Sequence, residues 1–288
     1  VQWDNKDKVA ARLAKLGGCS AEEMIITRNT TESIDLVVSG FDWQKGDEAV
    51  MAIQDYGSML DMFEQVKNRY GIVNVKVSIP NHPTNDEEIV AIYEKAITSK
   101  TKLMMVSHMI NITGHILPIK KICAMAHAKG VQVIVDGAHA FAHFQYSIPD
   151  LGCDYFASSL HKWLSAPFGS GLLWIKKEKI KNIWALLSNN EPDGTDIRKF
   201  ESLGTRSFAS EMAIGNAVDF HNVIGSQRKE ERLRYLTDYW INKVSDLKRV
   251  SFLQPKNKQL YCAISNIVID PGFGFAKTLE QNYEVLHK

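Results

Sequence analysis

The chain has 288 residues, of which 45% are hydrophobic and 23% are charged. At roughly 100–200 residues per domain, this length predicts one large domain or a large domain with a smaller companion, and the composition excludes a disordered or fibrous protein. The 34 Lys and Arg residues almost balance the 33 Asp and Glu residues, leaving a formal charge of +1. We therefore expect neither a nucleic-acid partner nor an anionic membrane surface.

The ends of the sequence and its cysteines indicate a compartment. No apolar run approaches the ~20 residues that cross a bilayer, and the first residues do not have the pattern of a signal peptide. The sequence lacks an initiator Met, so we expect it to begin inside a longer chain. Its four cysteines are scattered and form no CxxC pair. This usage predicts free thiols, no zinc site and a cytoplasmic location.

Apolar periodicity predicts regular alternation along most of the chain. In order, the pattern predicts a helix over 5–16, a strand over 24–26, a helix over 32–38, a strand over 49–53, a helix over 57–69, a strand over 73–77, a helix over 85–98, a strand over 103–106, a helix over 119–126 and a strand over 131–135. Pro118 and Gly130 stand where a helix begins and ends. Such alternation predicts an α/β fold, with a mostly parallel sheet between two layers of helices.

The pattern changes near the C-terminus. A charged helix over 227–249 precedes two short strands, 250–253 and 263–269. Its apolar residues are in helical phase: Leu233, Leu236, Trp240, Val244 and Leu247. We therefore predict a large domain over 1–249 and part of a small α+β domain over 250–288, which is too short to form its own core.

In an open parallel sheet, ligands bind beyond the carboxyl ends of the strands. The segment Asn29–Ser33 joins a predicted strand to a helix. Asn29 and Glu32 fit a capping box, which is a purely structural interpretation. The alternative is a phosphate site made by helix N–H groups with the hydroxyls of Thr30 and Thr31.

Two more polar clusters follow buried strands. Asp136 ends one strand, where a carboxylate is either a turn cap or a partner for a ligand. Lys162 lies between His161 and Trp163, away from charged runs; it is either a surface side chain or a Schiff-base lysine. Together the three clusters offer an anion site, a carboxylate and an amine. Pyridoxal phosphate needs these groups for its phosphate, ring nitrogen and aldehyde.

At these residues the sequence resembles the class V aminotransferase family of pyridoxal phosphate-dependent, fold-type I enzymes. The matching stretches appear in the family's order: TRNTTESID (27–35), GDEAVMAIQDYGSML (46–60), SHMINITGHILPI (107–119), VIVDGAHAFA (133–142), SSLHKW (158–163) and FESLGTR (200–206). The DGAHA form is most similar to the isopenicillin N epimerase-like branch, whereas cysteine desulfurases more often have Gln at the position of His139.

The resemblance implies a role for each matching residue. Lys162 would form the Schiff base and Asp136 would pair with the ring nitrogen. Asn111 and His139 would contact the phenolic oxygen, and Tyr56 would stack on the ring. The remaining expected cofactor contacts are Thr30, Thr31, Ser159 and His161 at the phosphate, with Gly204 and Thr205 reaching it from the neighbouring subunit of a homodimer. No metal is expected.

The same resemblance implies chemistry at the Cα of an amino acid, with Lys162 as the base. Epimerase- or aminotransferase-like activity is our first expectation. The alternative is β-elimination, like that of cysteine desulfurase, selenocysteine lyase or kynureninase; Tyr56, where desulfurases usually have His, counts modestly against it. Outside enzymes, the alternative is a non-catalytic relative that binds a phosphorylated ligand. Family members are longer at both ends, and their small domain usually supplies the arginine that anchors the substrate carboxylate.

Overall fold

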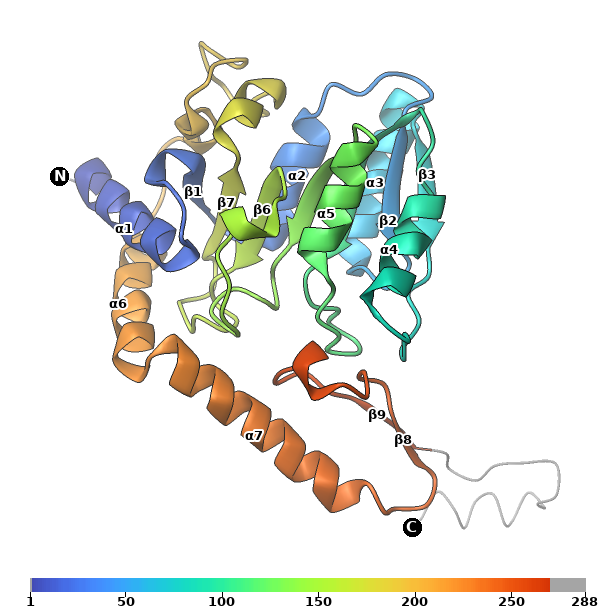
Figure 1. The fold of residues 1–288 in the computed structure, drawn as a ribbon. Helices are drawn as coiled ribbons and strands as arrows, with labels where there is room; N and C mark the ends of the chain where they lie inside the picture. The colour runs from blue at the N-terminus through green and yellow to red at the C-terminus, as the bar shows by residue number, and fades with distance from the viewer. Residues whose placement is uncertain (1, 270–288) are drawn as a thin grey trace, which may run out of the picture.

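A computed structural model describes residues 2–269 of the chain, with side chains from residue 4 onward. Its centre is a seven-stranded sheet in the order β1-β7-β6-β5-β4-β2-β3 (Figure 1). The strands are β1 (Met24–Thr27), β2 (Glu48–Ala52), β3 (Val73–Val77), β4 (Thr101–Ser107), β5 (Gln132–Asp136), β6 (Tyr155–Ser159) and β7 (Gly171–Ile175). β7 runs antiparallel to both of its neighbours, β1 and β6, and the other pairs are parallel. The predicted mostly parallel sheet is therefore confirmed.

Helices cover both faces of this sheet. α2 (Thr30–Gly40) and α3 (Gly57–Tyr70) pack on one face, and α1 (Gln2–Gly17), α4 (Asp86–Lys95), α5 (Ile119–Ala128) and α6 (Ala209–Ile224) belong to the other. Successive strand residues alternate between the two cores: Met104 packs with α4 and α5, whereas Met105 packs with α2 and α3. Since both faces are covered, the central strands β6 and β7 are fully buried, whereas the edge strand β3 is partly exposed and contains Asn74 and Lys76. The three-layer αβα architecture is confirmed.

Local sequence explains most element boundaries. α1 ends at Gly17, and Gly18 takes a φ of +71° that suits glycine. α5 starts directly after Pro118 and buries the predicted face of Ile119, Ile122, Cys123 and Ala126. α4 ends at Lys95, three residues earlier than predicted. β7 and α6 were not predicted from the pattern.

The C-terminal part differs most from expectation. α7 (Ser226–Val244) ends five residues before the predicted end, and Leu236 on its predicted apolar face is 43% exposed. In Figure 1 this helix extends away from the layered body. β8 (Val250–Phe252) and β9 (Ile267–Ile269) form a separate antiparallel pair, so the second predicted strand begins four residues late. The predicted 250–288 unit lies partly outside the described residues, and its boundary stays a prediction.

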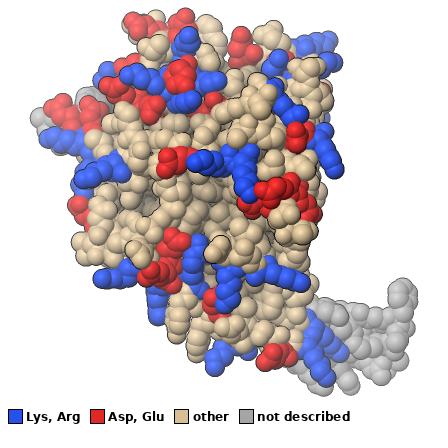
Figure 2. Space-filling model, in the orientation of Figure 1, with Lys and Arg blue, Asp and Glu red and all other residues tan. Residues whose placement is uncertain are grey.

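The surface carries both signs of charge. On the face shown in Figure 2, Lys and Arg side chains are interspersed with Asp and Glu. Among residues 2–269, no helix is both long and apolar enough to cross a bilayer. All four cysteines are free, and burial raises the thiol pKa of Cys123 and Cys262 to about 12.

Candidate active site

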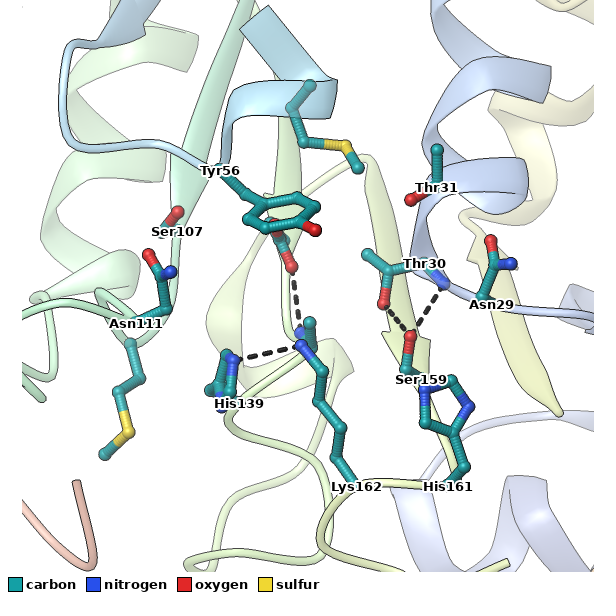
Figure 3. A pocket seen from close by; sticks show the side chains of 14 residues that line it. Asn29, Thr30, Thr31, Tyr56, Ser107, Asn111, His139, Ser159, His161 and Lys162 are labelled. Atoms are coloured by element: carbon teal, nitrogen blue, oxygen red, sulfur yellow. Dashed lines mark hydrogen bonds between the residues drawn. The ribbon is translucent and has the colours of Figure 1, made fainter. Parts of the chain in front are cut away.

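A cavity at the carboxyl ends of β4, β5 and β6 collects the predicted site residues (Figure 3). Every predicted residue except Gly204 and Thr205 lines it: Thr30, Thr31, Tyr56, Asn111, Asp136, His139, Ser159, His161 and Lys162. Thr205 is exposed in the segment before α6 and does not line this cavity. Its expected contact across a subunit interface stays a prediction.

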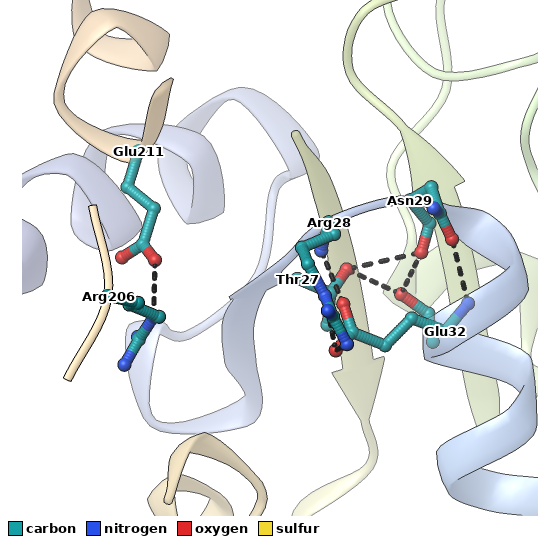
Figure 4. Close-up of polar contacts among 7 residues, drawn as sticks. Thr27, Arg28, Asn29, Glu32, Arg206 and Glu211 are labelled. Atoms are coloured by element: carbon teal, nitrogen blue, oxygen red, sulfur yellow. Dashed lines mark hydrogen bonds and ion pairs between the residues drawn. The ribbon is translucent and has the colours of Figure 1, made fainter. Parts of the chain in front are cut away.

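The first wall of the cavity is the N-terminus of α2. Asn29 Oδ1 accepts a hydrogen bond from the Glu32 amide at 2.8 Å, so Asn29 caps the helix (Figure 4). The Glu32 carboxylate accepts from the Arg28 amide at 2.6 Å, one residue before the position that a standard capping box uses. The capping interpretation is thus essentially correct, and the same turn also lines the cavity.

Hydroxyl groups concentrate beside this helix end. Ser159 Oγ accepts from the Thr30 amide at 2.9 Å and lies 2.7 Å from Thr30 Oγ1. His161 donates from Nδ1 to the Ser170 carbonyl at 3.2 Å, and its ring also lines the cavity. Amide and hydroxyl donors at the positive end of a helix form a binding site for an anion such as phosphate.

The second wall carries a buried carboxylate. Asp136 ends β5 and is 7% exposed. Its Oδ1 accepts from the Ala138 amide at 2.9 Å. Burial raises the pKa of Asp136, while the Ala138 amide and the positive charge of Lys162 lower it. A cationic group in the cavity would compensate the cost of burying this carboxylate.

Lys162 supplies an amine opposite these groups. Its Nζ lies 2.9 Å from His139 Nε2, and Figure 3 shows the side chain reaching up between His139 and the Thr30–Ser159 pair. Burial lowers the pKa of Lys162, although Asp136 opposes this shift. Burial and Lys162 also lower the pKa of His139 to about 4. A larger unprotonated fraction makes the amine a better nucleophile and base.

The structure adds residues that the sequence did not single out. Met59, Ser107, Met109 and Ala138 also line the cavity. Ser107 could have been found, because it directly follows the strand predicted over 103–106 and pairs with Asp136. It donates to the buried carboxylate of Asp55 at 2.6 Å. The two methionines gave no comparable signal, since apolar residues at strand and helix positions normally belong to the core.

Arg206 does not reach this cavity. Its Nε donates to Glu211 Oε1 at 2.9 Å (Figure 4), so the structure gives no reason to assign it as the carboxylate anchor. Within the described residues, no group of three or more His, Cys, Asp or Glu side chains is placed to hold a metal ion.

Comparisons with known proteins agree with this geometry. The sequence profile of "Aminotransferase class-V" matches residues 4–277. An isopenicillin N epimerase of Streptomyces clavuligerus is 28% identical over 90% of this chain and 69% of its own length. A probable cysteine desulfurase of Halalkalibacterium halodurans is 31% identical over 83% of this chain and 61% of its own length. The chain is therefore shorter than both of these relatives.

Solved structures share the fold. The apo cysteine desulfurase of Thermococcus onnurineus matches with a TM-score of 0.84 and 23% identity, over 94% of this chain and 69% of that one. A C-DES variant with glycine covalently linked to its PLP cofactor has a TM-score of 0.84 and 20% identity, over 95% and 74% of the two chains.

Proposed function

The chain belongs to the aminotransferase class-V family, and we propose that it acts at the Cα of an amino acid through a Schiff base between Lys162 and pyridoxal phosphate. The family uses this cofactor, and the chain is a pyridoxal phosphate-dependent enzyme. The observation that carries the proposal is one cavity in which an amine of lowered pKa faces a buried carboxylate and a helix N-terminus.

The residues present fit the cofactor. Thr30, Thr31, Ser159, His161 and the N-terminus of α2 would hold the phosphate, which accounts for the hydroxyl cluster. Asp136 would pair with the ring nitrogen, which explains a carboxylate buried with few other partners. The remaining contacts would come from Tyr56 on the ring and from Asn111 and His139 at the phenolic oxygen.

Each side chain then has a task. When bound, the cofactor withdraws electrons from Cα and so stabilises the negative charge that develops there. Lys162 removes the Cα proton and returns a proton, since its lowered pKa suits a general base. Asp136 would hold the positive charge of the ring nitrogen in place. The N-terminus of α2 would hold the phosphate and so keep the cofactor from drifting.

Within the family we favour epimerase- or aminotransferase-like chemistry over desulfuration. Tyr56 lines the cavity at the position where desulfurases usually have His, and this departure supports the preference. Cys262 is fully buried, and burial raises its pKa to about 12, so it is a poor nucleophile. The names of the relatives cover both chemistries, so the choice depends on experiment.

We further propose a homodimer in which Thr205 contributes to the neighbouring site. Thr205 is exposed, and Phe168 in the loop after Lys162 is 86% exposed. Ser210 Oγ donates to the Phe168 carbonyl at 3.4 Å, so the two segments are neighbours. A subunit interface over these two segments would cover the exposed Phe168 ring together with Thr205.

Subunit complementation tests this arrangement. Lys162→Ala and Thr205→Ala chains are mixed after mild dissociation. If Thr205 acts across the interface, one site of each hybrid carries both changes and the other carries neither. Cofactor binding should then recover in the mixture, up to half of the sites in each hybrid. If Thr205 acts within its own chain, every site retains one change and mixing restores nothing.

Spectroscopy tests the cofactor itself. The purified chain, loaded with pyridoxal phosphate, should show a visible absorption band, and borohydride should fix the cofactor on the peptide that contains Lys162. Lys162→Ala should lose both signals, whereas Lys181→Ala, an exposed lysine on the surface, should keep them. No band in the wild-type chain would support the non-catalytic alternative and contradict the proposal.

Single amino acids in deuterated water then separate the reactions. Solvent deuterium at Cα with scrambled chirality identifies an epimerase, and a keto acid identifies an aminotransferase. Rapid formation of alanine from cysteine would overturn our preference. A reducing, cytoplasmic location remains part of the proposal, supported by four free thiols.

A further inference from the structure

His139 lies between the side-chain nitrogen atoms of Lys162 and Trp163, and each of them contacts a different nitrogen of its ring. The Lys162 Nζ is 2.9 Å from Nε2, and the Trp163 indole Nε1 donates to Nδ1 over 3.4 Å. An indole N–H is a donor only, so His139 Nδ1 must accept. The ring proton of a neutral His139 is then on Nε2, where it faces Lys162.

His139 is in the neutral form to which this argument applies. Burial is the main cause that lowers its pKa to about 4; the charge of a protonated Lys162 is the smaller cause. In the tautomer with the proton on Nε2, the ring donates and the Lys162 amine accepts. This contact therefore involves the unprotonated form of Lys162, and burial shifts its pKa in the direction that favours this form.

The Trp163 indole is itself held in place by a second histidine. Its ring stacks on His143 with centroids 3.6 Å apart and planes 17° apart. Its carbonyl accepts a hydrogen bond from Lys229 of α7. The indole N–H therefore has one orientation, and that orientation is directed at His139.

The His143 ring is also restricted to one tautomer. Its Nδ1 donates to the His139 carbonyl at 2.7 Å, and its Nε2 accepts from the Ala263 amide at 2.9 Å. His143 is 1% exposed, so water does not compete for these bonds. A chain of directed contacts thus runs from the C-terminal segment at Ala263, through His143 and Trp163, to His139 and Lys162.

We infer that Trp163 is a positioning residue that fixes His139 in the tautomer with its proton on Nε2, so that His139 presents a donor to the amine and to the group held there. The inference rests on the proposed function for its consequence, because a donor at this place stabilises a phenolic oxygen that carries negative charge. A tautomer of the opposite kind would present a lone pair and repel that oxygen.

The first test needs no cofactor. The chain is labelled with ¹⁵N-histidine, and His139 is assigned from its missing signals in His139→Ala. Wild-type His139 should show a protonated Nε2 and an unprotonated Nδ1. Trp163→Phe keeps a ring to stack on His143 but removes the N–H, and a share of His139 should then carry its proton on Nδ1. Trp184→Phe, a half-exposed tryptophan outside the cavity, should change nothing. An unaltered His139 tautomer in Trp163→Phe would overturn the inference.

The second test separates positioning from packing. Trp163→Phe should weaken pyridoxal phosphate binding by about threefold to tenfold, the value of one hydrogen bond, and should shift the absorption band. In a His139→Ala background the same change should have no effect on affinity, because there is no ring to orient. Equal losses in both backgrounds would show that Trp163 acts through packing alone and would refute the inference. If the wild-type chain binds no pyridoxal phosphate, the proposed function fails, while the tautomer measurement still decides the role of Trp163.

Discussion

Gly171 provides a sharp test of the anion cradle, the site formed by the N-terminus of α2 with the hydroxyls of Thr30 and Ser159. Changing Gly171 removes no polar group from this site. It starts β7 and is paired with Thr27 of β1 on one side and Ser159 of β6 on the other. A Cβ atom at this position would lie 2.7 Å from both the N and Cα atoms of Asn29. Gly171→Ala should therefore push the Asn29–Thr30 turn away from Ser159.

The size of the effect follows from the contact distances. Non-bonded carbon atoms prefer about 3.5–4.0 Å, so the turn must retreat by about 1 Å. The two contacts between Thr30 and Ser159, at 2.9 and 2.7 Å, would then be too long for hydrogen bonds. Two lost bonds at about 1 kcal/mol each, with an overpacking cost of about 1 kcal/mol, lower the unfolding free energy by about 3 kcal/mol.

Ligand affinity should measure the effect of Gly171→Ala on the anion cradle separately from its effect on folding stability. Affinity for pyridoxal phosphate should fall by about tenfold or more, whereas affinity for pyridoxal, which has no phosphate, should change little. Gly169→Ala is the matched control, because its Cβ meets nothing within 4 Å and adds only the strain of a φ of +76°. Equal losses for both ligands, or wild-type stability in Gly171→Ala, would refute the reasoning.

Three further changes test other parts of the structure. Asp136→Asn removes the charge that raises the pKa of Lys162, so the pKa of Lys162 should fall further. The pH dependence of lysine modification in the cofactor-free chain measures this pKa. A rise in the pKa of Lys162 would contradict the assignment. Burial raises the pKa of Asp55 from 3.8 to about 7. Its stabilising contribution is therefore complete below pH 3.8 and is lost as the pH rises through about 7, so in Asp55→Asn the unfolding free energy should decline less over this range. A Cβ at Gly137 would lie 2.0 Å from the buried Phe156 ring. Gly137→Ala should lower the unfolding free energy by about 3 kcal/mol in urea titrations, and an unchanged midpoint would exclude this packing.

Much of the candidate site could be predicted because the relevant signals are local. Asp136 follows the strand predicted over 131–135, in which four of the five residues are apolar, and Asn29 precedes a helix. Parallel strands bring their carboxyl ends to one edge, so polar residues at those ends lie on the same side of the sheet. The strand order then decides which of them are neighbours. The resemblance of the quoted stretches to one family then supplied the roles of Tyr56 and Asn111, which periodicity alone could not.

Other features depended on contacts between distant segments. α6 and β7 were missed, and the apolar phase of α7 predicted a buried face where Leu236 is 43% exposed. Periodicity shows that a helix has an apolar face but not which element covers it.

The sequence by itself determined the alternation of strands and helices and placed an amine, a carboxylate and a helix N-terminus at the ends of strands. Only the tertiary structure decided which hydrogen bonds those groups make. The indole of Trp163 contacts His139 because the indole stacks on the His143 ring, and His143 Nδ1 donates to the His139 carbonyl. Backbone patterns are set by neighbouring residues along the chain, whereas the direction of a side-chain hydrogen bond depends on atoms that only folding brings together.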